Sequence, residues 1–308
     1  MGTTVRLYFT EGRPGLEGQL LTLLERLEQA WSRFRDDSEI SRLNDSAGAA
    51  TSVGPSTQLL VERALQASRL TRGWFDPTLL HELCSAGYDR PFREMSSAGL
   101  GPLVLTIDRR ADPGHAVRLH DWNAIASEIT VDRDEATVTL PGDVAFDPGG
   151  IGKGLAADLL TEAAAAGGAA AVLIDLGGDI TTAGRAPEGG WRIDIENPFD
   201  RSSSIATAHL PWGAIATSSR SRRRWVGPDG TERHHLIAPT TGEPSTSDVA
   251  AATVIAGECW LAESVAKAAV LAGLETGLDL VASLGLHALV VDAEGAQHAT
   301  PGMNGFLS

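Results

Sequence analysis

Asp147-Pro-Gly-Gly-Ile-Gly-Lys-Gly154 leads into a run of good helix formers that ends at Ala166. Short, partly β-branched segments within residues 136–146 precede it, so the pattern predicts strand, glycine loop and helix. The glycines leave backbone N–H groups open to a ligand, and a helix N-terminus favours an anion. Lys153 adds a mobile cation. A phosphate-binding loop and a purely structural glycine turn both fit this stretch.

The loop matches neither of the two common nucleotide-binding loops. A Walker A loop needs Ser or Thr after its lysine, whereas Gly154 follows Lys153 here. The spacing Gly-x-Gly-x-x-Gly of the Rossmann fingerprint is absent from it as well. Other parts of the chain must therefore indicate the ligand.

The composition is that of a globular protein with a substantial core. The chain has 308 residues, 43% of them hydrophobic and 34 of them glycine, which suits an α/β or α+β fold. A formal net charge of −15 and a pI near 4.9 disfavour non-specific nucleic-acid binding. Arginines cluster within residues 220–224, which form either a solvated loop or a docking point for an anionic group.

Cysteine usage and hydropathy indicate the compartment. Cys84 and Cys259 have no metal-binding or disulfide spacing and are expected to be reduced, buried thiols. The first ten residues show no apolar signal core, and no segment is long and apolar enough to cross a bilayer. We expect a soluble, cytoplasmic protein with no nucleic-acid partner and no transmembrane segment.

Hydrophobic periodicity predicts helices and strands along the whole chain. Residues 35–44 are predicted as a polar turn. No repeat of fixed period and no low-complexity linker divides the chain, so one intertwined domain over residues 1–308 is expected. Helices are predicted at 16–34, 56–71, 154–166 and 259–271, and strands at 3–10, 169–175, 191–198, 212–219, 251–256 and 286–292.

Short motifs spread over nearly the whole chain occur in an informative order. They are Met1-Gly-Thr3, Phe34-Arg-Asp-Asp-Ser-Glu-Ile-Ser-Arg-Leu-Asn44, Gly73-Trp-Phe-Asp-Pro-Thr78, the glycine loop, Gly177-Gly-Asp179, Ala214-Ile-Ala-Thr-Ser218, His235-Leu-Ile-Ala-Pro-Thr-Thr-Gly242 and Glu263-Ser-Val-Ala-Lys-Ala-Ala-Val-Leu-Ala-Gly273. In this order they resemble the ApbE family of FAD:protein FMN transferases. Each motif alone is a weak signal, and the ordered set is a strong one.

The resemblance implies a fold, a reaction and a set of site residues. The fold would be an α/β (mixed α+β), ApbE-like domain that binds FAD, with Mg²⁺ at the diphosphate. The FMN moiety would pass to a Ser or Thr hydroxyl of an acceptor flavoprotein, and AMP would leave. His235 would lie near the reacting phosphate, to assist proton transfer or to bind phosphate. Motif position implies FAD contacts from Met1, Phe34, Trp74, Phe75, Asp76, Asp147, Lys153 and Ile237.

The implied metal site departs from the family pattern. In the family, a C-terminal helix carries Asp and Thr as metal ligands four residues apart, whereas this chain has Glu263 and Lys267. Glutamate can ligate Mg²⁺, but a charged ammonium has no lone pair and repels a cation. By position the metal-site residues are Gly150, Glu263 and Lys267. Ala238 and Ser219 are lesser departures in the same region.

Three interpretations of Glu263 and Lys267 stay open at this point. Lys267 replaces the metal on the diphosphate and is oriented by Glu263, or the two form a plain helix salt bridge in a site without metal. Alternatively, Mg²⁺ binds through Glu263, a carbonyl near Gly150 and waters, with Lys267 swung aside. We favour a weakened or absent protein-held metal. FMN transfer is the leading function, and FAD hydrolysis to FMN and AMP or FAD binding without catalysis are the alternatives.

Overall fold

The computed structural model describes residues 3–95, 100, 103, 105, 126, 128–227 and 229–308. Met1, one of the predicted cofactor contacts, lies outside the described residues. None of the described helices combines the length and the apolar character that crossing a bilayer requires.

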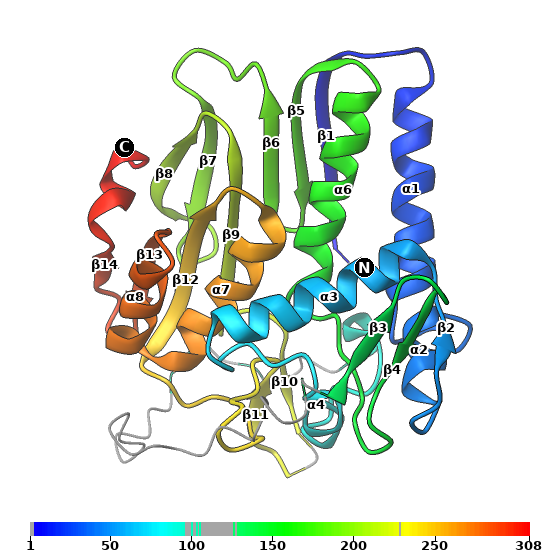
Figure 1. The fold of residues 1–308 in the computed structure, drawn as a ribbon. Helices are drawn as coiled ribbons and strands as arrows, with labels where there is room; N and C mark the ends of the chain where they lie inside the picture. Colours follow the sequence, from blue (N-terminus) through cyan, green and yellow to red (C-terminus); the bar gives the residue numbers. More distant parts are fainter. Residues whose placement is uncertain are drawn as a thin grey trace.

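A large antiparallel sheet forms the centre of the fold (Figure 1). Within the described residues it has seven strands in the order β1-β5-β6-β9-β12-β13-β14, and every neighbouring pair is antiparallel. The predicted mixture of helices and strands is confirmed. The strands are β1 Val5–Glu11, β5 Ala169–Leu176, β6 Ile180–Gly184, β9 Gly213–Ser219, β12 Val249–Ala256, β13 His287–Asp292 and β14 Gln297–Ala299.

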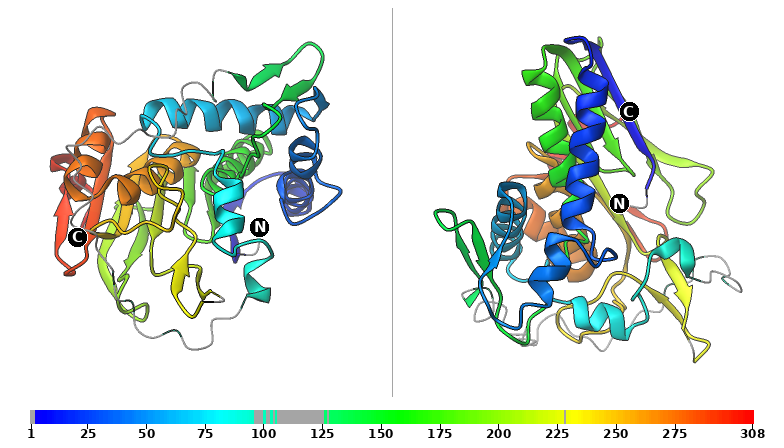
Figure 2. Two further views of the ribbon diagram at one scale, coloured as in Figure 1. Left: turned by 90° about the horizontal axis from the view of Figure 1, so that it is seen from below. Right: turned by 90° about the vertical axis from the view of Figure 1, so that its right-hand side faces the viewer.

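Both faces of the sheet are covered, which buries β12 along its whole length. Ile215 of β9 and Ile255 of β12 pack against a hairpin of β7 (Trp191–Glu196) and β8 (Ser204–Leu210). Figure 2 shows this hairpin and helix α6 on opposite faces of the sheet. On the helical face Ala216 of β9 and Ala256 of β12 pack against Ala262 of α7, and such small side chains let the helix lie close to the strands.

Helices α6 (Gly152–Ala166) and α7 (Cys259–Ala272) lie side by side on the sheet (Figure 1). The side chain of Asp158 in α6 accepts the N–H groups of Cys259 at 2.9 Å and Trp260 at 3.0 Å, and so caps the first turn of α7. The other helices are α1 Leu16–Trp31, α2 Glu39–Asn44, α3 Pro55–Leu70, α4 Leu80–Ser85, α8 Leu274–Ser283 and the 3₁₀ turns η1 Phe92–Glu94 and η2 Pro301–Gly305.

Two small sheets extend the fold below the central one. Strands β2 (Thr51–Ser52), β4 (Thr137–Thr139) and β3 (Thr130–Asp132) form one of them, and β10 (Arg224–Val226) pairs with β11 (Glu232–His234) in the other. The β10–β11 pair connects the arginine cluster to His235.

The predicted polar turn at residues 35–44 is wrong, because helix α2 occupies Glu39–Asn44. Ser38 caps this helix by accepting the N–H of Ser41 at 2.9 Å, and Ile40 and Leu43 lie buried three positions apart. Residues 144–146 also form no strand, since Ala145 makes only an isolated bridge to Leu79.

Candidate active site

The glycine loop brings α6 and α7 together as well as shaping a site. A Cβ on Gly154 would lie 2.6 Å from the carbonyl carbon of Cys259 and 2.8 Å from the nitrogen of Trp260, and closer still to the Cys259 carbonyl oxygen. Gly150 has a φ of 135°, a conformation that L side chains rarely adopt. These glycines therefore have structural roles in addition to any role in binding.

Lys153 lies between two buried carboxylates. Its Nζ donates to Glu263 Oε1 at 2.7 Å and forms a close ion pair with Asp179. Glu263 Oε2 accepts the N–H of Gly154 at 2.7 Å. Because a carboxylate of the protein itself takes this N–H at the start of α6, the loop does not present the open anion cradle that its sequence indicates.

Lys267 reaches the loop from α7. Its Nζ donates to the carbonyl oxygen of Gly149 at 2.9 Å and lies 5.6 Å from the centre of the Phe75 ring. Burial lowers the pKa of Lys267, and the charges of Asp147 and Glu263 oppose this shift. Among the described residues no ion pair joins Glu263 to Lys267, so the interpretation as a plain helix salt bridge is wrong.

Asp147 and Phe34 are connected through Arg33, a residue that the motif comparison missed. Arg33 Nε lies 3.4 Å from Asp147 Oδ1 in a largely buried ion pair. The Arg33 guanidinium stacks over the rings of Phe34 at 4.1 Å and Tyr88 at 4.7 Å. Phe34 itself is exposed, so its ring is accessible to a planar ligand at the rim of the site.

The aromatic motif places Phe75 and Asp76 against the loop and turns Trp74 toward the core. Phe75 is buried, and Trp74 is partly buried between two hydrophobic clusters. Asp76 Oδ1 accepts the N–H of Thr78 at 2.8 Å and its hydroxyl at 2.6 Å. Its buried Oδ2 has no hydrogen-bond partner among the described residues. A hydrogen-bond donor of a ligand would therefore be stabilised next to this carboxylate oxygen.

His235 and its neighbour His234 have different surroundings. His234 donates from Nε2 to the Ser245 carbonyl at 3.0 Å and accepts the Leu236 N–H on Nδ1 at 3.3 Å. His235 Nδ1 is buried without a partner among the described residues. Burial lowers the pKa of His235 well below its usual value, and the positive charges of Arg223 and Lys267 lower it further. The lowered pKa favours the neutral form of the His235 imidazole.

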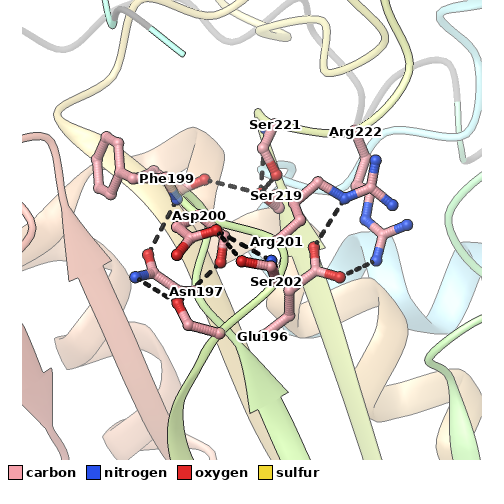
Figure 3. Close-up of polar contacts among 11 residues, drawn as sticks. Glu196, Asn197, Phe199, Asp200, Arg201, Ser202, Ser219, Ser221 and Arg222 are labelled. Carbon is pink, nitrogen blue, oxygen red and sulfur yellow. Dashed lines mark hydrogen bonds and ion pairs between the residues drawn. The ribbon is translucent and has the colours of Figure 1, made fainter. Parts of the chain in front are cut away.

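The arginine cluster is mostly bound within the protein. Figure 3 shows Glu196 bound to both Arg201 and Arg222. Arg222 Nη2 donates to Glu196 Oε2 at 2.6 Å, and Arg201 Nε donates to Oε1 at 3.2 Å. Arg224 pairs with Glu232. Arg223 differs: it has a left-handed φ of 47° and no hydrogen-bond or ion-pair partner among the described residues.

The donor set does not fit a magnesium ion. In the described part of the chain, no group of three or more His, Cys, Asp or Glu side chains is placed to hold a metal ion. Both oxygens of Glu263 are bound by Lys153 and Gly154, and the Gly149 carbonyl is bound by Lys267. The residues that would hold the ion are therefore bound to cationic or N–H groups of the protein.

Most of the predicted site residues come together in one place. Ile237 differs from the others because it is a core residue. Its side chain is 3% exposed and packs with Leu79, Tyr88 and Trp225 below the site. Asp179 entered the sequence analysis only as part of the Gly177-Gly-Asp179 motif, and nothing in its local sequence predicts its ion pair with Lys153. The residues that surround the N-terminus of α6 are Phe75, Asp76, Asp147, Gly150, Lys153, His235, Glu263 and Lys267.

A sequence profile of the ApbE family matches residues 1–290. The chain belongs to the ApbE family. Similar ApbE relatives include a FAD:protein FMN transferase of Vibrio cholerae, 25% identical over 100% of this chain and 91% of the relative. Another FAD:protein FMN transferase, from Treponema pallidum, is 28% identical over 98% of this chain and 85% of its own length.

Solved structures of ApbE proteins share the fold. The ApbE protein of Thermotoga maritima has a TM-score of 0.81 at 24% identity, covering 100% of this chain and 96% of that one. The flavin transferase ApbE of Vibrio cholerae has a TM-score of 0.76 at 26% identity, with the same coverage of 100% and 96%. The predicted ApbE-like fold is confirmed.

Proposed function

We propose that this protein is an FAD:protein FMN transferase, which moves FMN from FAD onto a Ser or Thr hydroxyl of an acceptor flavoprotein. The observation that carries the proposal is the match to such a transferase along 100% of the chain. The site supports it, because a neutral histidine lies among cations at the start of a helix. Residues 1–308 would act as one domain, and a cytoplasmic location stays a prediction.

In the proposed reaction, the acceptor oxygen attacks the phosphorus of the FMN half of FAD. The bond from that phosphorus to the bridging oxygen breaks, and AMP leaves with this oxygen. His235 takes the proton of the attacking hydroxyl and passes it to solvent, which a neutral imidazole can do. Lys267 and Arg223 face the same region and offset the charge that builds on the phosphate oxygens.

The roles proposed for the remaining predicted contact residues follow from their positions in the site. The exposed ring of Phe34 would stack on a planar part of FAD, and Asp76 Oδ2 would accept a donor from it. Trp74, Phe75 and Ile237 shape the apolar walls from behind. Asp147 positions Arg33, and Met1 stays a predicted contact. Mg²⁺ does not enter the proposed mechanism, since the donor set does not fit it.

The test is transfer to a protein. The chain is incubated with FAD and the acceptor protein of the Vibrio cholerae relative, with that relative as positive control and a Ser/Thr→Ala acceptor as negative control. We expect acid-stable flavin fluorescence on the intact acceptor and release of an equal amount of AMP. Free FMN and AMP without labelled acceptor would mean hydrolysis, and bound FAD that stays intact would mean binding without catalysis. Either result contradicts the proposal.

Replacement of His235 by asparagine is expected to slow FMN transfer by roughly 10²–10⁴-fold, the usual contribution of a positioned proton acceptor. Thermal stability should change little, because His235 Nδ1 makes no hydrogen bond within the described residues. His81→Asn, at an exposed histidine, is the matched control and should transfer at the wild-type rate. Equal rates for the two variants would remove His235 from the mechanism.

The pH profile of transfer follows from the lowered pKa of His235. A histidine with its ordinary pKa near 6.5 would become protonated and inactive as a base when the pH falls through that value. Because burial and neighbouring cations keep His235 neutral, kcat/KM should not fall with such a step between about pH 8 and pH 6. Initial-rate measurements across this range check it, and an acidic limb near 6.5 that His235→Asn abolishes would contradict it.

A further inference from the structure

The sequence contains two lysines, Lys153 and Lys267, and both are in the candidate site. Every other basic side chain among its 25 Lys and Arg residues is an arginine. An arginine offers a wide planar fork, whereas a lysine offers a compact point charge with three donors. The two places where this chain uses a small ammonium are therefore the two places beside the glycine loop.

The residues around the side chain of Lys267 fit an ammonium group. A Cβ on Gly150 would lie 2.8 Å from Lys267 Cδ and 3.0 Å from its Nζ, so a larger residue at this position would displace the lysine from the loop. Phe75 supports the group from the other side, with its ring centre 5.6 Å from Nζ. The Gly149 carbonyl is the one hydrogen-bond acceptor of Nζ among the described residues, which leaves two N–H donors for a ligand.

The charges around Lys267 are those that a bound cation would need. The negative charges of Asp147, Glu263 and Asp76 all act to raise the pKa of Lys267, although none of these carboxylates forms an ion pair with it among the described residues. Lys267 already offsets this negative charge, and a divalent ion beside it would meet a like charge in a poorly hydrated place. Arg223, the arginine without a partner among the described residues, adds a second positive charge that both Lys267 and His235 experience.

We propose that Lys267 replaces the divalent metal in this protein and that its two remaining N–H groups bind the diphosphate of the ligand directly. This proposal rests on the proposed function, since it takes the ligand to be FAD. It assigns the orientation of the ammonium to Gly149 and Phe75, rather than to Glu263. Glu263 instead holds Lys153 and the first turn of α6.

The first test needs no variant. FAD binding to the wild-type protein is measured by flavin fluorescence quenching and calorimetry, once with EDTA and once with excess Mg²⁺. We expect the dissociation constants of FAD with EDTA and with Mg²⁺ to agree within about twofold, because neither the metal-binding side chains nor the local charge favours a bound Mg²⁺. Binding of Mn²⁺ in the absence of FAD is followed by electron paramagnetic resonance. We expect no protein-bound Mn²⁺ at protein concentrations at which a metal site would be occupied.

The second test uses Lys267→Met, which keeps the length of the side chain and removes its charge. FAD affinity in EDTA should fall about tenfold to hundredfold, the loss expected for a charged hydrogen-bond donor. Arg222→Ala is the matched control: it removes a cation of the neighbouring loop that is bound to Glu196, and FAD affinity should not change. The double variant Glu263→Asp with Lys267→Thr should gain Mn²⁺ binding and a Mg²⁺-dependent affinity for FAD.

The possible outcomes separate this proposal from the proposed function. Stoichiometric Mn²⁺ in the wild type, FAD binding that Mg²⁺ tightens tenfold or more, or unchanged affinity in Lys267→Met would each overturn the proposal while leaving a flavin-binding protein. No FAD binding under any condition would overturn both. The Mn²⁺ and Mg²⁺ measurements on the wild type decide the matter even if Lys267→Met does not fold.

Discussion

Replacement of Gly154 by alanine is expected to destabilise the protein by about 3 kcal/mol, the upper end of the usual cost of overpacking, although alanine is the better helix former. The new Cβ would lie 2.6 Å from the carbonyl carbon of Cys259 and 2.8 Å from the nitrogen of Trp260. Both neighbours are backbone atoms, held by hydrogen bonds to Asp158, so they cannot turn aside as a side chain would. Helices α6 and α7 would have to separate.

Gly152→Ala is the matched control for this result. It adds the same methyl group two residues earlier in the same helix, where the nearest atom is Pro148 Cβ at 3.5 Å, an ordinary contact distance. We expect its unfolding free energy to lie within about 1 kcal/mol of the wild type. Urea denaturation of the three proteins checks both values. Equal stability of Gly154→Ala and Gly152→Ala would show that the helices can separate at little cost.

Replacement of Lys153 by methionine is expected to lower the unfolding free energy by about 3–5 kcal/mol, the typical loss when one partner of a buried ion pair is removed. The side chains of Asp179 and Glu263 are only 3% and 5% exposed, so both carboxylates would stay buried next to each other without their cation. Flavin transfer should be lost as well, because Glu263 also holds the Gly154 N–H at the start of α6.

The double variant Lys153→Met with Glu263→Gln provides the control. A glutamine can still accept the Gly154 N–H and carries no charge, so the double variant should be more stable than Lys153→Met alone. Urea denaturation of the wild type, both single variants and the double variant gives the coupling energy between the two residues. A coupling near zero would mean that this ion pair does not stabilise the fold.

Local sequence signals identified most elements of the fold for a simple reason: a helix or strand depends on the spacing of its own side chains. The helix predicted at 154–166 and the strand predicted at 169–175 were observed as α6 and β5, with ends moved by one or two residues. Helix α2 was missed because its residues are mostly polar, and its stability comes from the cap at Ser38 and two buried side chains.

Motif order pointed to residues that lie together around the N-terminus of α6, but it did not predict the contacts between them. Glu263 and Lys267 have the spacing of a helix ion pair, yet each binds a group more than a hundred positions away in the chain. Arg33 and Asp179 were missed for the same reason, since each becomes informative only through a distant partner, Asp147 or Lys153. No local pattern encodes such a pairing.

The sequence by itself determined the family, the alternation of helices and strands, and the combination of several glycines with Lys153 in one loop. Only the tertiary structure decided which charged groups neutralise one another there. The physical reason is that the approach of α6 to α7, permitted by Gly154, sets the distance between Lys153 and Glu263. The same packing places Lys267 on the Gly149 carbonyl, at the position where the sequence comparison implied a metal.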